Sequence, residues 1–330
     1  MRIAVDAMGG DHAPREIVQG CLEAAHGIDG TLLLVGQKDR IESEIRGEKP
    51  RNVEIIHASE VIEMDDKPTE ALRKKKDSSI SVCTRMVKEG EADAFVSAGN
   101  TGAVTAASLL AWRQIEGVHR PAIATHFPCR SGQFLLLDAG ASPDIDPENL
   151  VEFAHMGRVY AEKVMGKRNA KVHLLNIGEE PGKGNMFAKK AYEFMDGAPW
   201  FAGNIEGKDM FTAPCDVVVC DAFVGNILLK TAEGLGEFLM SEIRDAVPKG
   251  AGKILFIPMK SALAPLKKKV DYAEIGGSPL LGLNGVCIIC HGRSNAKAIR
   301  NAIGQAALGV RNELIESIRN SFREESGIKA

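Results

Sequence analysis

Short apolar runs rich in valine, isoleucine and leucine alternate along the chain with longer stretches of helical periodicity, and small-residue loops separate them. Continuous apolar runs are typical of parallel strands covered on both faces. The pattern therefore predicts an α/β fold in which a mainly parallel sheet lies between two helical layers, a three-layer α/β/α arrangement. The runs 122–126 and 134–137 are joined by a turn containing Pro128, which predicts a local hairpin. The predicted strands are 3–5, 32–35, 53–56, 94–97, 122–126, 134–137, 172–175, 217–220 and 286–289.

The sequence predicts helices at three places. Asp146, Pro147 and Glu148 supply an N-cap, a proline in the first turn and an early acidic residue, which predicts a helix that continues to about residue 165. Helical periodicity also covers 226–246 and 294–322, the latter as one or two amphipathic helices. The chain contains no internal repeat and no low-complexity linker. We therefore expect residues 1–330 to form one domain, either undivided or in two lobes.

The composition narrows the class of protein. The 330 residues are 45% hydrophobic, 26% charged and 5% aromatic, which excludes disordered, collagen-like and coiled-coil chains. A formal net charge of -3 argues against nucleic-acid binding through a global positive field. Seven cysteines, an odd number in so long a chain, indicate a reducing compartment and no disulfide framework. With no signal peptide and no apolar run near about 18 residues, we expect a cytoplasmic protein.

Loops rich in glycine and small polar residues follow many of the predicted strands. At the carboxyl edge of a parallel sheet such loops converge, and glycine lets their backbone N–H groups approach a ligand. Each following helix N-terminus adds unpaired donors, which favours an anion such as phosphate. Tight turns and helix caps explain any single loop, but the set favours a ligand site. These loops are 6–14, 97–102, 138–142, 176–185, 221–226 and 291–295.

Several familiar kinds of site are missing from the sequence. No loop reads G-x-x-x-x-G-K-[ST] or carries G-x-G-x-x-G after a strand, which weakens the ATP and nicotinamide hypotheses. Neither G-x-S-x-G nor H-E-x-x-H occurs. Cys287 and Cys290 lie in a strand pattern and are expected to pack in the core. Asp216 and Asp221 bracket another strand, where acids serve more often as caps than as metal ligands, so we expect no metal and no cofactor.

Two segments stand out by charge. The basic run Arg73, Lys74, Lys75 and Lys76 fits either a solvated helix end or a docking patch for an acidic partner. The segment 258–272 is apolar on one side and cationic on the other, which fits an anionic membrane surface, a subunit contact or a core-facing helix. Its apolar positions are Met259, Leu263, Leu266 and Val270, and its cationic positions include Lys267, Lys268 and Lys269.

Four motifs in order along the chain resemble the bacterial phosphate acyltransferase (PlsX) family. They are MRIAVDAMGGD at 1–11, SAGNTGA at 97–103, DAFVGN at 221–226 and IGGSPLLG at 275–282. The resemblance implies a fold akin to phosphate acetyltransferase and to the isocitrate and isopropylmalate dehydrogenases. It also implies a reaction in which acyl-[acyl carrier protein] and inorganic phosphate give acyl phosphate and free carrier protein.

The same resemblance implies several partners. Family members are homodimers that bind membranes peripherally, and their product feeds a glycerol-3-phosphate acyltransferase in phospholipid synthesis. Two other classes of protein remain open from the sequence alone. A decarboxylating dehydrogenase of related fold would bind a nicotinamide cofactor and a divalent metal, whereas a non-catalytic membrane scaffold would bind lipid without turnover.

The residues of the motifs and loops are assigned as follows. Lys183 and Asn226 are the catalytic candidates, with Asn226 facing the thioester oxygen. The other expected phosphate-binding residues are Asn100, Thr101, Gly102 and Asn185. Further candidates for the same site are Asp6, Gly9, Gly10 and His12. The acidic carrier protein is expected to dock on residues 73–76 or on the lysines at 267–269.

Overall fold

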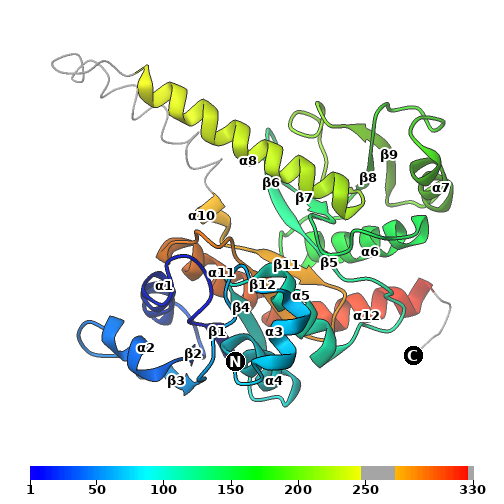
Figure 1. Ribbon diagram of the computed structural model, residues 1–330. Coiled ribbons are helices and arrows are strands. Elements are labelled where there is room, and N and C mark those ends of the chain that lie inside the picture. The colour runs from blue at the N-terminus through cyan, green and yellow to red at the C-terminus, as the bar shows by residue number, and fades with distance from the viewer. Residues whose placement is uncertain (247–271, 326–330) are drawn as a thin grey trace.

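The computed structural model describes residues 1–246 and 272–325. It contains two β-sheets, each flanked by helices (Figure 1). The first sheet runs in the order β3 (Val53–His57), β2 (Thr31–Gly36), β1 (Arg2–Asp6), β4 (Ala94–Ser97), β12 (Val286–Ile289), β11 (Ser278–Leu281) and β5 (Ala122–Ile123). The second runs in the order β6 (Thr125–Cys129), β7 (Gly132–Leu137), β10 (Val217–Val219), β8 (Val172–Asn176) and β9 (Phe201–Glu206).

Most neighbouring strands are parallel, as predicted. In the first sheet β1 pairs in parallel with β2 and β4, and β12 with β4. In the second, β10 pairs in parallel with β7 and β8. Antiparallel pairs occur at β11, which lies between β12 and β5, and in the β6–β7 hairpin. The predicted hairpin is thus confirmed.

The predicted strand 122–126 is divided between the two sheets. Ala122 and Ile123 form β5 and pair with β11, whereas the chain from Thr125 onward pairs with β7. Between them, the backbone N–H of Ala124 donates a hydrogen bond of 2.9 Å to the carbonyl of Pro279. Because the run is apolar up to this crossing, its pattern contains no sign of the division. The expectation of one sheet with one carboxyl edge is therefore wrong.

Helices cover both faces of each sheet. In the first sheet, α1 (Arg15–Ala25) and α11 (Ala296–Arg311) pack on one face, and α4 (Ser79–Lys88) and α5 (Thr101–Trp112) pack on the other. In the second, α6 (Pro147–Lys163) and α12 (Leu314–Glu325) cover one face, and α8 (Ala222–Asp245) lies against the other. Each sheet is thus the middle of three layers, as the sequence predicts. The remaining helices of the described residues are α2 (Lys38–Glu44), α3 (Pro68–Lys74), α7 (Met186–Met195) and α10 (Tyr272–Ile275).

Several local predictions are confirmed. α6 begins after Asp146, whose side chain forms a reciprocal capping box with Asn149. The C-terminal stretch forms two helices, α11 and α12. Cys287 packs with α4 and α5, and Cys290 packs with α1 and α11 on the opposite face, so both are core residues. α8 begins at Ala222, four residues before the predicted start.

α8 extends away from the rest of the structure along much of its length (Figure 1). It carries a row of exposed large apolar side chains, namely Phe223, Val224, Ile227, Leu235, Phe238 and Leu239. Within residues 1–246 and 272–325, no helix combines the length and the apolar character needed to cross a bilayer. The predicted amphipathic segment 258–272 lies outside the described residues except at its final residue.

Candidate active site at the carboxyl edges of the two sheets

The loops that follow β1 and β4 are joined by a buried carboxylate. Ser97 Oγ donates a hydrogen bond of 2.7 Å to Asp6 Oδ2, and the backbone N–H of Met8 donates to Asp6 Oδ1 at 3.1 Å. Burial raises the pKa of Asp6, while hydrogen bonds from Ser79, Ser97 and the backbone act in the opposite direction. Asp6 therefore acts in this structure as the link between two loops.

A third loop, after β12, joins the same group. The backbone N–H of Asp11 donates to the carbonyl of Gly292 at 2.8 Å. Gly9 lies where no side chain fits, because a Cβ there would lie 2.4 Å from Asp6 Oδ2 and 2.6 Å from the backbone nitrogen of Gly99. His12 is exposed in the first of these loops. The carboxyl edge of the first sheet thus brings together three of the predicted loops.

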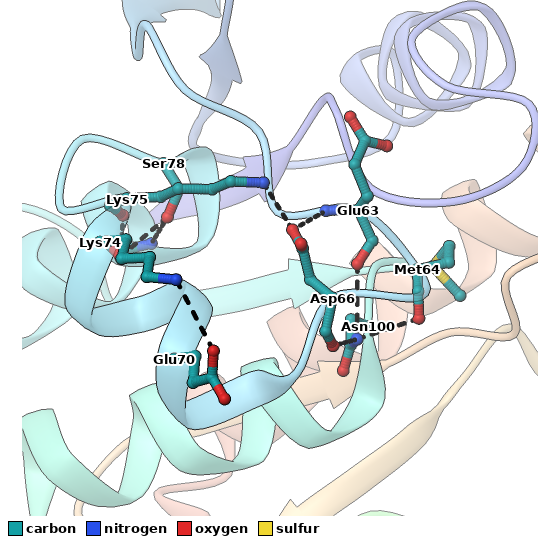
Figure 2. A network of polar contacts seen from close by, with 9 residues as sticks. Glu63, Met64, Asp66, Glu70, Lys74, Lys75, Ser78 and Asn100 are labelled. Atoms are coloured by element: carbon teal, nitrogen blue, oxygen red, sulfur yellow. Dashed lines mark hydrogen bonds and ion pairs between the residues drawn. The ribbon is translucent and has the colours of Figure 1, made fainter.

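Asn100 caps α5 and ties a neighbouring segment to it. Its Oδ1 accepts a hydrogen bond of 3.0 Å from the N–H of Ala103. Its Nδ2 donates to the carbonyls of Met64 and Asp66 at 3.0 and 2.9 Å, and more weakly to that of Glu63 (Figure 2). Both ends of the amide are therefore occupied. Thr101 and Gly102 follow it, exposed, in the first turn of α5. Phosphate binding by these residues stays a prediction.

The basic run is partly neutralised by the same network. Lys75 Nζ lies 2.5 Å from Asp66 Oδ2, and Lys74 Nζ lies 3.6 Å from Glu70 Oε2 (Figure 2). The hydrogen bond from Lys75 is the main reason why the pKa of Asp66 is lowered. Among the described residues, Arg73 and Lys76 form no ion pair, and both are exposed. Lys75 is therefore the most firmly held cation of the run, whereas the exposed ion pair of Lys74 is weak.

At the carboxyl edge of the second sheet, Asp138 organises the loop after β7. It accepts hydrogen bonds from the backbone N–H groups of Ile123, Gly140, Ala141 and Ser142. Burial raises the pKa of Asp138, and these donors oppose the rise. Asn226 lies directly beside this loop, because a Cβ at Gly140 would lie 3.7 Å from Asn226 Oδ1. The exposed amide of Asn226 is thus placed over the loop.

The loop after β8 carries the two other candidates. Asn185 caps α7, its Oδ1 accepting a hydrogen bond of 2.8 Å from the N–H of Ala188. Lys183 Nζ lies 4.0 Å from Glu180 Oε1, and about half of the Lys183 side chain is exposed. The carbonyl of Lys183 accepts a hydrogen bond from Asn176 Nδ2, which holds the loop against β8. Lys183 is thus presented to solvent by an anchored loop.

A cavity of about 460 Å³ opens beside the second sheet's carboxyl edge. Asn185 and Asp221 line it, so the loops after β8 and β10 meet there as predicted. Arg120, which sequence reasoning missed, lines the same cavity from the segment before β5. The other lining residues are Pro143, Asp144, Ile145, Asp146 and Phe187. Lys183 and Asn226 do not line it, and their sharing of one bound anion stays a prediction.

α8 connects the two carboxyl edges. Asn226, near the start of the helix, lies beside Gly140, and Glu237 Oε1, farther along the helix, lies 2.8 Å from Arg293 Nη2 in the loop after β12. Leu229 packs against the clusters of both sheets. Near the middle of α8, the charges of Glu233 and Lys230 act on His291, whose pKa is lowered chiefly by burial. The predicted loops therefore gather at two edges that share one helix.

The acids weighed as metal ligands have other partners. Asp221 Oδ1 accepts a hydrogen bond of 2.9 Å from the N–H of Val224 and so caps α8. Asp216 Oδ1 lies 3.1 Å from Lys167 Nζ, and Asp216 Oδ2 accepts from the N–H of Lys171. In the part of the chain that the structure describes, no group of three or more His, Cys, Asp or Glu side chains is placed to hold a metal ion.

Comparison with known proteins identifies the family. Residues 1–317 match a family described as "Fatty acid synthesis protein". The chain is 53% identical over 328 residues to the phosphate acyltransferase of Heliobacterium modesticaldum, covering 97% of each chain. It is 51% identical over 326 residues to that of Desulfitobacterium hafniense, covering 98% of each. The chain belongs to the phosphate acyltransferase family.

Comparison with solved structures identifies the fold of this member of the phosphate acyltransferase family. The phosphotransacetylase from Streptococcus pyogenes superposes with a TM-score of 0.62 at 18% sequence identity, covering 94% of each chain. The EutD phosphotransacetylase from Staphylococcus aureus superposes with a TM-score of 0.60 at 14% identity, also over 94% of each chain. The predicted phosphate acetyltransferase-like fold is thus confirmed.

Proposed function

We propose that the chain transfers a long-chain acyl group from the thioester of acyl-[acyl carrier protein] to inorganic phosphate, giving acyl phosphate for phospholipid synthesis. The family of its relatives supports acyl transfer to phosphate. The structural observation that carries the proposal is the path of α8. This helix places the Asn226 amide beside the loop after β7 and joins that edge to the loop after β12. In this proposal, the thioester and the phosphate lie beside this helix.

The chemistry requires little acid or base catalysis. Inorganic phosphate has a second pKa of about 7, roughly one unit above that of a phosphate monoester, so a substantial fraction of it is dianionic at neutral pH. One of its oxygens attacks the thioester carbon, and the carbon–sulfur bond then breaks as the tetrahedral intermediate collapses. The thiol of the departing group has a pKa of about 8.5 in free cysteine, so it leaves readily as a thiolate. The proton that remained on phosphate ends on that sulfur, so no net proton is consumed.

The protein then has to position the anionic phosphate against the neutral thioester and stabilise the oxyanion that forms. Asn226 is suited to the thioester oxygen, because its side-chain amide is a neutral donor at the start of a helix. The first turn of α5, with Thr101 and Gly102, offers backbone donors to phosphate. Lys183 adds a cation on the loop after β8, and Arg120 adds one at the cavity beside it. Positioning and charge stabilisation are the main sources of rate in such a transfer.

The carrier protein is the proposed donor, and its acidic surface needs a basic counterpart. Arg73 and Lys76 are the two cations of the basic run that form no ion pair among the described residues. Their position supports docking near the site, because Lys75 of the same run is tied through Asp66 to Asn100 (Figure 2). We propose that the carrier docks at α3 and delivers its acyl group toward the start of α5.

We propose further that the chain acts as a homodimer in the cytoplasm. The exposed apolar row on α8 supports this, since Phe223 is 68% exposed and Phe238 is 58% exposed. Large apolar side chains gathered on one exposed element are typical of an interaction surface. Leu235→Glu combined with Phe238→Glu should then shift the protein to monomer in sedimentation analysis. A variant that sediments like the wild type would count against this assembly.

Peripheral membrane binding is the remaining part of the proposal. It rests on the apolar and basic residues of the segment 258–272. Leu263→Glu combined with Leu266→Glu should release the protein from vesicles of anionic lipid, whereas acyl transfer in solution continues. Unchanged co-sedimentation with those vesicles would assign membrane binding to another part of the chain.

The reaction itself has a direct test. The purified chain is incubated with long-chain acyl-[acyl carrier protein] and inorganic phosphate, and acyl phosphate is trapped as hydroxamate with hydroxylamine. A parallel reaction without phosphate measures direct attack of hydroxylamine on the thioester. Phosphate-dependent hydroxamate is the expected result. Its absence, together with binding of a nicotinamide cofactor, would favour the dehydrogenase alternative instead.

A further inference from the structure

One face of α8 carries four polar residues that point toward both carboxyl edges. A helix turns by about 100° per residue, so Asn226, Lys230, Glu233 and Glu237 fall within an arc of about 60°. Asn226 marks the near end of this face, beside Gly140 of the second sheet's edge. Glu237 marks the far end, in contact with Arg293 of the first sheet's edge. The face therefore spans the region between the two edges.

Lys230 is the cation of this face, one turn beyond Asn226. Four residues correspond to about 6 Å along the helix, a separation at which two side chains contact a single tetrahedral group. The charge of Lys230 also acts on His291, so its ammonium lies within electrostatic range of the loop after β12. Asn226 and Lys230 thus face the same space from the same rigid element.

The contacts of Lys230 leave it able to bind a ligand. Its Nζ lies 2.8 Å from Glu233 Oε2, and 55% of its side chain is exposed. The Glu233 side chain is 34% exposed, so solvent screens this ion pair in part, and the ammonium group has three donors, of which Glu233 takes one. A phosphate dianion can therefore take one or two of these donors without a large cost. The other cation placed by this face, Arg293, is held by Glu237.

We infer that Lys230 binds the attacking phosphate, next to an Asn226 that holds the thioester oxygen. This inference rests on the proposed function and names a residue that the sequence motifs did not single out. In this arrangement the lysine neutralises one charge of the dianion and directs an oxygen toward the thioester carbon. Glu233 opposes phosphate binding, because its carboxylate competes for the same ammonium and repels the dianion.

The chain offers a control lysine of equal exposure. Lys190 on α7 also pairs with a glutamate three residues later, and its side chain is likewise 55% exposed. Lys190→Met and Lys230→Met therefore remove the same charge from equally exposed lysines, although Lys190 is paired more loosely, at 3.8 Å from Glu193 Oε2 against 2.8 Å from Glu233 Oε2 for Lys230. Far-ultraviolet circular dichroism and thermal melting should show both variants folded, since neither lysine is buried. A Lys230→Arg variant keeps the charge with altered geometry.

The kinetic experiment measures the KM for phosphate and the KM for acyl-[acyl carrier protein] in each variant. Lys230→Met should raise the KM for phosphate by about 10-fold to 100-fold, the usual size of a lost hydrogen bond to a charged group. The KM for acyl-[acyl carrier protein] should change by less than about threefold. Lys230→Arg should recover part of the loss, Glu233→Gln should lower the KM for phosphate, and Lys190→Met should resemble the wild type. A phosphate KM within twofold of the wild type in Lys230→Met overturns the inference.

A binding measurement keeps this outcome distinct from failure of the proposed reaction. Inorganic phosphate should raise the melting temperature of the wild type and of Lys190→Met, but not that of Lys230→Met. If the wild type produces no acyl phosphate but shows this pattern, the reaction is wrong and the phosphate site stands. If phosphate protects Lys230→Met as well as it protects the wild type, or protects neither, the inference is overturned.

Discussion

Ser97 Oγ donates a hydrogen bond of 2.7 Å to the buried Asp6 Oδ2, and this contact joins the loops after β1 and β4. The two residues are far apart in sequence, on neighbouring parallel strands. Their contact leaves no room for a side chain at Gly9. The shape of this edge therefore depends on a few small residues around one carboxylate.

Gly9→Ala should disrupt that edge. The new methyl group would overlap Asp6 Oδ2 and the backbone of Gly99, so the loops have to move apart. We expect a loss of about 1–3 kcal/mol in the free energy of unfolding, measured by urea denaturation, and a large loss of acyl-phosphate formation. Gly304→Ala in α11 is the control, because a Cβ there meets nothing within 4 Å. Equal effects of the two substitutions would refute the steric explanation.

Lys183→Ala and Asn226→Ala should impair turnover without unfolding the protein, since both side chains are largely exposed. Loss of one donor to the developing oxyanion lowers kcat by roughly 100-fold to 1000-fold, which we expect for Asn226. Lys183→Ala should act mainly on the KM for phosphate. Steady-state hydroxamate assays measure both constants. Normal acyl-phosphate formation in both variants would contradict the assignment of these two residues.

Two substitutions of Asn100 distinguish a structural role of its side chain from a role in phosphate binding. Asn100→Ser keeps an N-cap acceptor but loses the amide that donates to the 63–66 segment, so the melting temperature should fall modestly. Asn100→Asp also keeps the cap but turns a carboxylate toward those carbonyls, which should cost about 2 kcal/mol or more. If both variants melt like the wild type but bind phosphate poorly, Asn100 acts on the ligand directly.

Charge reversal on the basic run should affect the carrier substrate. Arg73→Glu combined with Lys76→Glu should raise the KM for acyl-[acyl carrier protein] at least several-fold, more at low salt than at high salt, with little change in the KM for phosphate. Lys38→Glu combined with Arg40→Glu on α2 controls for total charge. Equal changes in the KM for both substrates would contradict the proposed docking of the carrier protein at Arg73 and Lys76.

His126 should make stability depend on pH. Burial lowers the pKa of His126 to about 4, from an ordinary value of 6.5. Below pH 6.5 the unfolded chain therefore binds a proton that the folded chain resists, and the free energy of unfolding falls until about pH 4. The contribution of His126 to the free energy of unfolding is at most about 3 kcal/mol.

His126→Leu should reduce the fall in the free energy of unfolding, as measured by denaturation between pH 7 and pH 4. His26→Leu, at an exposed histidine, should follow the wild type. Parallel curves for wild type and His126→Leu would refute this.

The prediction of elements succeeds where a pattern is local. Continuous apolar runs predict the parallel strands, and Asp146 with Pro147 predicts the start of α6, because capping depends on a few adjacent residues. β9 and β11 are missed. β9 contains Gly203 and Asn204, and β11 contains Pro279 between glycine-rich stretches, so neither has the composition expected of a strand. Their partners on other strands stabilise them.

The sequence predicts the individual loops and helix caps of the candidate site, but it does not predict which of them the fold brings together. Glycine and asparagine after strands indicate loops and helix caps, which is where Asn100 and Asn185 are found. Arg120 and Lys230 carry no such signal, since one lies in an ordinary connection and the other on a helix surface. The roles that we propose for them depend on which loops they approach, and that depends on the packing of two sheets.

Sequence alone determines the α/β class, the loops suited to an anion and, through four motifs, the family. Each of these properties follows from residues close together in the chain, or from the order of the motifs. Tertiary structure decides that there are two sheets, that the chain crosses between them at Ala124, and that α8 joins their edges through Glu237 and Arg293. Such choices depend on contacts between residues distant in sequence, whose burial and pairing energies exist only once the chain has folded.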